Sequence, residues 1–183
     1  MYELRRTDMY IEKVGDIFED VVMRYNDDGD VRYDAPDGVI YGQCVSADLA
    51  MGAGIATKFN YYFNTKNELL KYNKECLDIG LDVNFELCQY YYIKPVINFI
   101  TKEKYWHKPT KEDFAIALNY LPEAMTRINI SGKIKEIRVP MLGTGLDKLP
   151  WSFVKPILQR LANELEESGV DLVVIDPKLK EMV

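Results

Sequence analysis

The sequence predicts an α/β protein built around a mixed sheet. Short apolar stretches typical of strands alternate with longer segments whose apolar residues recur at helical spacing. The clearest helix covers residues 154–165, with Gly169 placed to end it, and the apolar strand 171–175 follows. Because such alternation is typical of layered α/β folds, we expect parallel strand neighbours toward the C-terminal half.

The composition is that of one ordinary globular domain. The chain has 183 residues, of which 48% are hydrophobic and 28% charged, and no apolar run approaches the length that spans a bilayer. The first ten residues include basic side chains but no apolar stretch after them, unlike a cleavable export signal. We therefore expect a single domain over residues 1–183, cytoplasmic, with no membrane partner and no cofactor.

Cysteine and histidine usage excludes several kinds of site. Cys44, Cys76 and Cys88 are widely spaced and fit neither a disulfide framework nor a zinc motif. His107 is the only histidine, so a multi-histidine metal centre cannot be built and a Ser/His/Asp triad can be built in one way only. We expect reduced thiols in the core and no metal.

Charge is distributed unevenly. The formal net charge of −6 opposes broad attraction to nucleic acid. One stretch is nevertheless basic, and it contains Lys102, Lys104, His107, Lys108 and Lys111. Such a run is usually a solvated face, and the alternative is an anionic ligand nearby.

The N-terminal elements follow from short-range patterns. Residues 9–14 alternate apolar and polar side chains, which predicts a half-buried strand, and a second strand is predicted at 39–45. The intervening segment 26–38 is rich in Asp, Asn and Gly, so we expect a mobile, solvated loop or a short exposed hairpin. Residues 51–63 begin with two glycines and continue with apolar residues four apart, which predicts a loop that leads into a helix.

The middle of the chain contains further helices and strands. A short helix is predicted at 67–76, followed by one or two strands within 85–101 that are interrupted at Pro95. The three tyrosines of this region are expected to be strand residues.

Residues 110–139 contain the next predicted helix and strand. Thr110 is typical of an N-cap, and the helix that it starts should run to about residue 129 with a division at Pro122. A strand at 134–139 then leads into a loop with two glycines.

Two glycine loops, 51–55 and 143–146, each follow a predicted strand and lead into a helix. In an open α/β sheet such loops gather at the carboxyl ends of the strands, where ligands bind. Glycine lets backbone amides approach phosphate oxygens closely, so the pair predicts a diphosphate clamp. Neither loop has the spacing of a nucleotide-triphosphate or dinucleotide fingerprint, and a single glycine turn often only connects elements.

Three motifs occur in a characteristic order: GQCVSADLAMGAGIA at 42–56, FITKEKYWHKPT at 99–110 and VPMLGTGLDKLPW at 139–151. Together they resemble the macro domain family, in the branch that contains the terminal ADP-ribose protein glycohydrolase and the related DNA ADP-ribosyl glycohydrolase antitoxins. The likeness covers residues 10–175. It implies a three-layer α/β/α fold with a mixed central sheet and a site for ADP-ribose.

The resemblance also implies roles for particular residues. Asp16, with Ile17 beside it in the segment VGDIF, would recognise the adenine amino group. Lys102 would act on the anomeric carbon of the distal ribose, and Asp147 would assist resolution of the resulting adduct. The residues implied along the ribose and diphosphate are Ser46, Met51, Gly52, Ala53, Gly54, Ile55, Gly143, Thr144, Gly145 and Leu146.

Each of these roles has an alternative. Without the resemblance, Lys102 would be an ordinary surface lysine and Asp147 a helix N-cap. A different alignment of this segment with the family motif would make Lys104 or Lys108 the reactive amine. His107 is expected to orient the HKPT turn by hydrogen bonding, and direct catalysis by this residue is the alternative.

The chain departs from its relatives in three places. A polar insertion occupies about 19–38, and the region 85–101 is also extended. SADLAMGAG replaces the asparagine-rich motif of many macro domains, which favours the lysine-dependent branch. The adenine-stacking residue is expected near Ile175 and Asp176.

The expected function is the removal of terminal ADP-ribose from acidic side chains, with ADP-ribose and ADP-ribosylated protein as partners. Deacetylation of O-acetyl-ADP-ribose is an expected side activity. Two alternatives stay open: a glycohydrolase for ADP-ribose linked to thymidine in DNA, and a reader that binds ADP-ribose without turnover.

Overall fold

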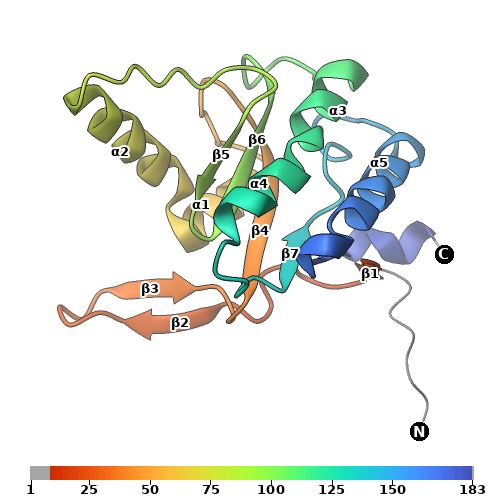
Figure 1. Ribbon diagram of the computed structural model, residues 1–183, viewed down its shortest axis with the longest axis horizontal. Coiled ribbons are helices and arrows are strands. Elements are labelled where there is room, and N and C mark those ends of the chain that lie inside the picture. The colour runs from red at the N-terminus through yellow and green to blue at the C-terminus, as the bar shows by residue number, and fades with distance from the viewer. Residues whose placement is uncertain (1–8, 183) are drawn as a thin grey trace, which may run out of the picture.

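The computed structural model describes residues 9–182. Residues 1–8, which entered the argument against an export signal, and residue 183 lie outside the described part. Six strands form one mixed sheet with helices packed on both faces, as Figure 1 shows. The predicted three-layer α/β/α fold is confirmed.

The strands of the sheet are β1 (Tyr10–Lys13), β4 (Val39–Ser46), β5 (Tyr90–Ile93), β6 (Val96–Lys102), β7 (Glu136–Val139) and β8 (Asp171–Ile175). The helices are α1 (Ile55–Phe63), α2 (Thr65–Asp78), α3 (Lys111–Asn119), α4 (Leu121–Ile128) and α5 (Trp151–Glu164), with short 3-10 turns η1 (Glu166–Ser168) and η2 (Pro177–Met182). The sheet order is β1-β8-β7-β4-β6-β5. Every neighbouring pair is parallel except β5 with β6, so the expected parallel pairs at the C-terminal half are present.

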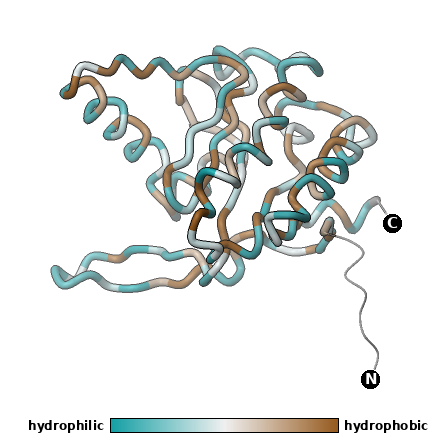
Figure 2. The backbone as a smooth tube through the Cα atoms, in the orientation of Figure 1, coloured by the Kyte–Doolittle hydropathy of each residue, from teal (hydrophilic) through white to brown (hydrophobic). Residues whose placement is uncertain are grey.

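The core occupies both faces of the sheet because successive strand residues point to opposite sides. In β6, Ile97 and Phe99 pack with α3, α4 and α5, whereas Val96 and Ile100 belong to the clusters beneath α1 and α2. One polar pair lies inside this layer: Gln43 Nε2 donates to Asn98 Oδ1 over 2.8 Å, and both residues are fully buried. Figure 2 shows hydrophobic and hydrophilic residues alternating along the helices, as expected of helices that bury one face.

Local signals place most helix ends. Thr110 is the N-cap of α3, and its Oγ1 accepts from the amide of Asp113 over 3.0 Å. Pro122 lies at the start of α4, where its missing amide costs least, so the predicted division of the 110–129 helix is confirmed. The helix expected at 67–76 is longer and begins at Thr65, because Asn64 turns the chain directly from α1 into α2.

The end of α5 differs from expectation. The helix ends at Glu164, and Gly169, at φ 63°, closes the 3-10 turn η1 instead of α5 itself. The added turn lets Leu165 stay fully buried before the chain reaches β8. The left-handed conformation expected of Gly169 is thus present, but after η1.

The polar insertion forms a hairpin. Its strands β2 (Val22–Tyr25) and β3 (Val31–Asp34) pair antiparallel and extend away from the main sheet (Figure 1). Of the two expected structures, loop or hairpin, the hairpin is found. It is attached at its base by Asp20, whose Oδ1 lies 2.5 Å from Arg138 Nη1, and by Tyr33, whose hydroxyl lies 3.0 Å from that of Tyr61 in α1.

Candidate active site

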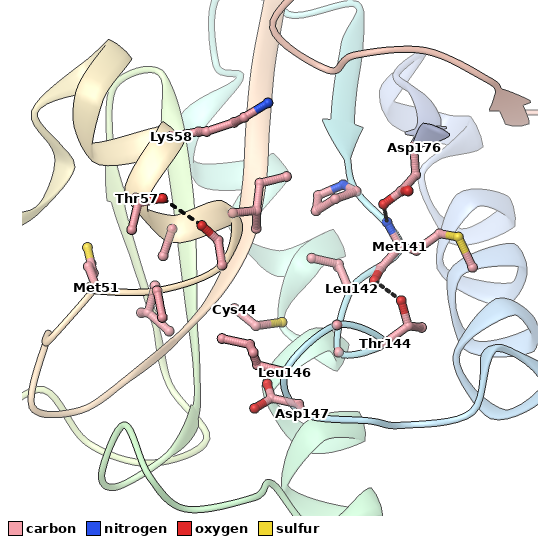
Figure 3. Close-up of a pocket in the computed structure, with 18 of the residues that line it drawn as sticks. Cys44, Met51, Thr57, Lys58, Met141, Leu142, Thr144, Leu146, Asp147 and Asp176 are labelled. Carbon is pink, nitrogen blue, oxygen red and sulfur yellow. Dashed lines mark hydrogen bonds between the residues drawn. The ribbon is translucent and has the colours of Figure 1, made fainter. Parts of the chain in front are cut away.

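A cavity of about 950 Å³ opens at the carboxyl ends of the parallel strands β4, β6, β7 and β8. Both glycine loops line it, and so does every residue of the predicted site. Figure 3 shows the two loops facing each other across the opening, with Met51 on one side and Thr144 on the other. The topology therefore brings together three motifs that are far apart in the sequence.

Lys102 and Asp147 contact each other in this cavity. Lys102 is the last residue of β6, Asp147 lies in the loop after β7, and Nζ donates to Oδ1 over 2.5 Å. Both side chains are 13% exposed, so the pair is shielded from solvent and yet reaches the cavity. Lys108, which a different register would make the reactive amine, donates instead to the carbonyl of Leu146. Pro150 is the N-cap of α5, so Asp147 does not cap that helix.

A register shift between β4 and β6 determines where Lys102 lies along the sheet. β4 and β6 pair regularly up to Val45 and Ile100, and Ser46 is then aligned with Lys102. The amide of Ala47 donates to the carbonyl of Lys102 over 2.9 Å, which fixes the lysine at the rim of the sheet. The side chain consequently leaves the sheet toward the cavity.

The second glycine loop depends on Gly143. This residue has φ 70°, and an added Cβ would lie 2.7 Å from Phe114 Cε2 and 2.9 Å from Leu149 Cδ1. The loop is closed by its own hydrogen bonds: the hydroxyl of Thr144 donates to Met141 O over 2.7 Å (Figure 3), and the amide of Leu149 donates to Gly143 O over 2.9 Å. The loop backbone is therefore held close to the ends of β7 and α3.

Three residues in or just before the first glycine loop have positive φ: Leu49, Met51 and Gly54, with φ of 50°, 46° and 62°. No described side chain caps the N-terminus of α1, which starts at Ile55. The amide of Thr57 donates to Gly54 O over 3.3 Å, and the two amides before it, at the positive end of the helix dipole, belong to residues that line the cavity. This arrangement suits an anionic group.

Asp48 connects the first glycine loop to the segment after β6. The hydroxyl of Ser46 donates to its Oδ1 over 2.5 Å, and the amide of Tyr105 donates to its Oδ2 over 3.2 Å. Burial acts to raise the pKa of Asp48, but these bonds, one from the amide of Ala50 and the positive charge of Lys104 outweigh it, so the pKa is lowered. Ser46 was expected along the distal ribose, and its hydroxyl proton is directed to this carboxylate.

The opposite end of the cavity is formed by Asp16 and the segment after β8. Asp16 accepts from the amide of Phe18 over 3.1 Å and lies 3.4 Å from Lys58 Nζ. Asp176 accepts from the amide of Met141 over 3.2 Å, as Figure 3 shows, and thus ties the end of β8 to the end of β7. The region named for adenine stacking therefore lines the cavity.

No family model matches the sequence. The fold, however, is similar to the macrodomain of DarG from Mycobacterium tuberculosis, with a TM-score of 0.63 and 21% identity over 93% of this chain and 99% of that one. The DarG macrodomain of Thermus aquaticus gives a TM-score of 0.63 and 24% identity over the same shares. In sequence, the chain is 32% identical to the ADP-ribose glycohydrolase OARD1 of Bos taurus over 118 residues, which are 64% of this chain and 70% of the relative. The chain belongs to the macrodomain family.

A third solved structure with a similar fold is Thermosipho africanus DarTG in complex with ADP-ribose, with a TM-score of 0.57 and 20% identity over 80% of this chain and 41% of that one. These likenesses confirm the family that the three motifs indicated. Within residues 9–182 of this macrodomain, no group of three metal-ligating side chains is found. None of the helices in that range combines the length and the apolar character that crossing a bilayer requires.

Lys58 and Asp48 are among the residues of this macrodomain site to which the sequence assigned no role. Lys58 follows the first glycine loop by less than one turn of α1, and this proximity was the available signal. Asp48 lies within the first of the three motifs, but its role depends on the amide of Tyr105 from a distant segment; the contact of Asp176, expected near the adenine, likewise depends on the amide of Met141. The three cysteines are free thiols as expected; Cys44 also lines the cavity, and burial, reinforced by Asp147, raises the pKa of its thiol.

Proposed function

We propose that this macrodomain binds ADP-ribose and removes terminal ADP-ribose from acidic side chains of modified proteins. The contact between Lys102 and Asp147 in the wall of the cavity is the observation that carries this proposal. A relative with 32% identity is named an ADP-ribose glycohydrolase, and a solved protein with this fold contains ADP-ribose. Both names agree with the chemistry of the site.

Binding relies on backbone groups and one carboxylate. The uncapped start of α1 and loop 143–146 line the cavity, and their backbone amides, apart from those of Thr57 and Thr144, which donate to Gly54 O and Met141 O, suit the negatively charged diphosphate. Asp16 is an acceptor for the adenine amino group: its Oδ1 accepts from the amide of Phe18 and its Oδ2 from Lys58, and each carboxylate oxygen has a second lone pair. The distal ribose then lies toward Lys102, and no cofactor enters the scheme.

The reaction uses Lys102 as nucleophile. Its amine, after giving a proton to Asp147, attacks the anomeric carbon of the distal ribose while the bond from that carbon to the side-chain carboxylate breaks. The carboxylate leaves with the electron pair. The bond from the anomeric carbon to the ring oxygen then breaks as the lysine nitrogen forms a double bond to that carbon, and a proton of the nitrogen passes to the ring oxygen. Water adds to this Schiff-base-type adduct, the bond to Lys102 breaks, the ring oxygen closes on the anomeric carbon again, and Asp147 returns the proton to the amine. The products are free ADP-ribose and the unmodified acidic side chain; with O-acetyl-ADP-ribose the leaving group is acetate where the acetyl group is on the anomeric oxygen.

A second candidate substrate is ADP-ribose linked to thymidine in DNA. Tyr105 and Trp106 lie just beyond β6, each 62% exposed, with ring centroids 4.9 Å apart, and Tyr105 also lines the cavity. Exposed aromatic rings beside a reactive centre suit stacking by a nucleobase. The net charge of −6 disfavours extended contact with a DNA backbone, so we rank this candidate second.

The test compares the wild-type protein with Lys102→Ala and Asp147→Ala on glutamate-linked and thymidine-linked ADP-ribose. We expect release from the glutamate-linked substrate by the wild type and loss of release in both variants, with ADP-ribose binding retained in calorimetry. Full activity of Lys102→Ala would contradict the lysine mechanism. Release from thymidine alone would favour the second candidate, and tight binding without any release would identify a reader.

A further inference from the structure

The loop that carries Asp147 needs support from outside itself. Its internal bonds join Thr144 to Met141, Leu149 to Gly143, and the amide of Lys148 to Gly145 O over 3.2 Å. These bonds close the loop but do not fix the tip relative to β6. Gly145 and Leu146 at that tip are exposed. Asp147 nevertheless points inward to Lys102.

The support comes from Lys108. Its ammonium group donates to the carbonyl oxygen of Leu146, the residue directly before Asp147. This bond joins the segment after β6 to the loop after β7. Because the acceptor belongs to the backbone next to Asp147, the bond constrains the direction in which the carboxylate leaves the chain.

The backbone segment that carries Lys108 is held by hydrogen bonds on both sides of this residue. Before it, the amide of Tyr105 donates to Asp48 Oδ2, and the amide of Asp48 donates to Glu103 O over 3.2 Å. After it, Thr110 caps α3. Lys108 thus extends from an anchored segment toward the less supported tip of the glycine loop.

We infer that Lys108 is a positioning residue, which holds the loop so that Asp147 stays against Lys102. The inference rests on the proposed function of that pair. Lys108 is absent from the described residues that line the cavity, so it acts through the loop and has no contact with the ligand space. The same loop tip also reaches Gly54, whose added Cβ would lie 3.2 Å from Leu146 Cδ1.

The variants separate this role from others. Lys108→Met removes the donor and keeps an unbranched side chain, whereas Lys108→Arg keeps a donor. Lys104→Met is the matched control, because Lys104 is an exposed lysine in the same segment with no hydrogen bond to the glycine loop among the described residues. Each variant is assayed for kcat and KM on glutamate-linked ADP-ribose, for the Kd of ADP-ribose and for Tm.

We expect Lys108→Met to lower kcat about tenfold or more, because a small displacement of a catalytic group is costly. The Kd of ADP-ribose and the Tm should change little, Lys108→Arg should recover most of the loss, and Lys104→Met should match the wild type. Wild-type kcat in Lys108→Met would overturn the inference. So would an equal loss of binding and Tm, which indicates a general structural role, or failure of Lys108→Arg to recover any activity.

Hydrogen–deuterium exchange keeps the test independent of turnover. Amides of residues 143–149 should exchange faster in Lys108→Met than in the wild type and in Lys104→Met. Unchanged exchange would overturn the inference even if the enzyme is active. Faster exchange in a protein whose wild type releases no ADP-ribose would locate the failure in the proposed function and not in the support by Lys108.

Discussion

Gly54 and Leu146 meet across the cavity although they belong to different glycine loops. A Cβ added to Gly54 would lie 3.2 Å from Leu146 Cδ1, and Gly54 has φ 62°. The two loops therefore leave no spare room where they approach each other. The absence of a side chain at Gly54 sets the width of the cleft between them.

Gly54→Ala should therefore weaken ADP-ribose binding. The new methyl group pushes Leu146 outward, and the backbone of Gly54, at φ 62° and ψ −153°, is a conformation essentially confined to glycine, which costs about 1 to 3 kcal/mol for alanine. We expect an increase of about tenfold in the Kd of ADP-ribose by calorimetry, which corresponds to roughly 1.4 kcal/mol. Gly52→Ala is the control for a general loss of stability, measured as the Tm, because the atom nearest to its added Cβ is 3.9 Å away. An unchanged Kd in Gly54→Ala would contradict the close approach.

Gly143→Ala should affect stability more strongly. The added Cβ would lie 2.7 Å from a ring carbon of Phe114, which is fully buried and cannot move freely. We expect a loss of about 2 to 4 kcal/mol in the free energy of unfolding, from overpacking and the positive φ together. Urea unfolding followed by circular dichroism measures it. A loss below that of Gly54→Ala would show that the loop can shift away from α3.

Asp48 should make the stability of the protein depend on pH in the acidic range. Its pKa is lowered in the folded state, so its contribution is present above the unfolded-state pKa of about 4 and is lost as the pH falls through the folded-state pKa. The wild type should exceed Asp48→Asn in Tm at pH 6, and the difference should shrink as the pH falls below about 4. A difference that stays constant over this range would exclude the carboxylate as its source.

Arg138 should hold the β2–β3 hairpin. Its guanidinium is 11% exposed and contacts both Asp20 and Glu136. Arg138→Met leaves the two carboxylates without this partner, and we expect a loss of about 2 to 4 kcal/mol in the free energy of unfolding. Asp20→Asn should lower the free energy of unfolding by less, because the Asp20 side chain is already 51% exposed. Proteolysis within residues 19–38 should accelerate in Arg138→Met, and equal cleavage rates would contradict this attachment.

Regular elements could be predicted because their signals are local. The apolar stripe of α5 and the strand Asp171–Ile175 follow from spacing alone, and the cap at Thr110 follows from one hydroxyl near one amide. The start of α2 could not be located, because it depends on a left-handed Asn64 that only the packing of α1 against α2 requires.

The site was predictable to the extent that it uses motifs. The glycine loops were predicted from their place between a strand and a helix, and the pair Lys102 and Asp147 from the resemblance that the three motifs carry; all of them line one cavity, and their roles stay predictions. The supports were not found. Asp48 and Lys108 form hydrogen bonds with backbone groups of other segments. Every residue except proline carries the same backbone amide and carbonyl, so no sequence motif marks the partner of such a bond.

The register shift between β4 and β6 lies one residue beyond the last regular pairing, between the strand residues that build the core and the lysine of the site. Through Val45 and Ile100 the two strands pair in step and supply the core, and only the next pairing, Ser46 with Lys102, is offset. Removing Thr101, which is itself fully buried, would leave the buried residues from Val96 to Ile100 in place and bring the lysine one position earlier, where side chains point to the opposite face. The same domain would then fold around a cleft that lacks the lysine amine. Relatives that lost hydrolysis but kept ADP-ribose binding could arise by such a change, without any substitution in the core.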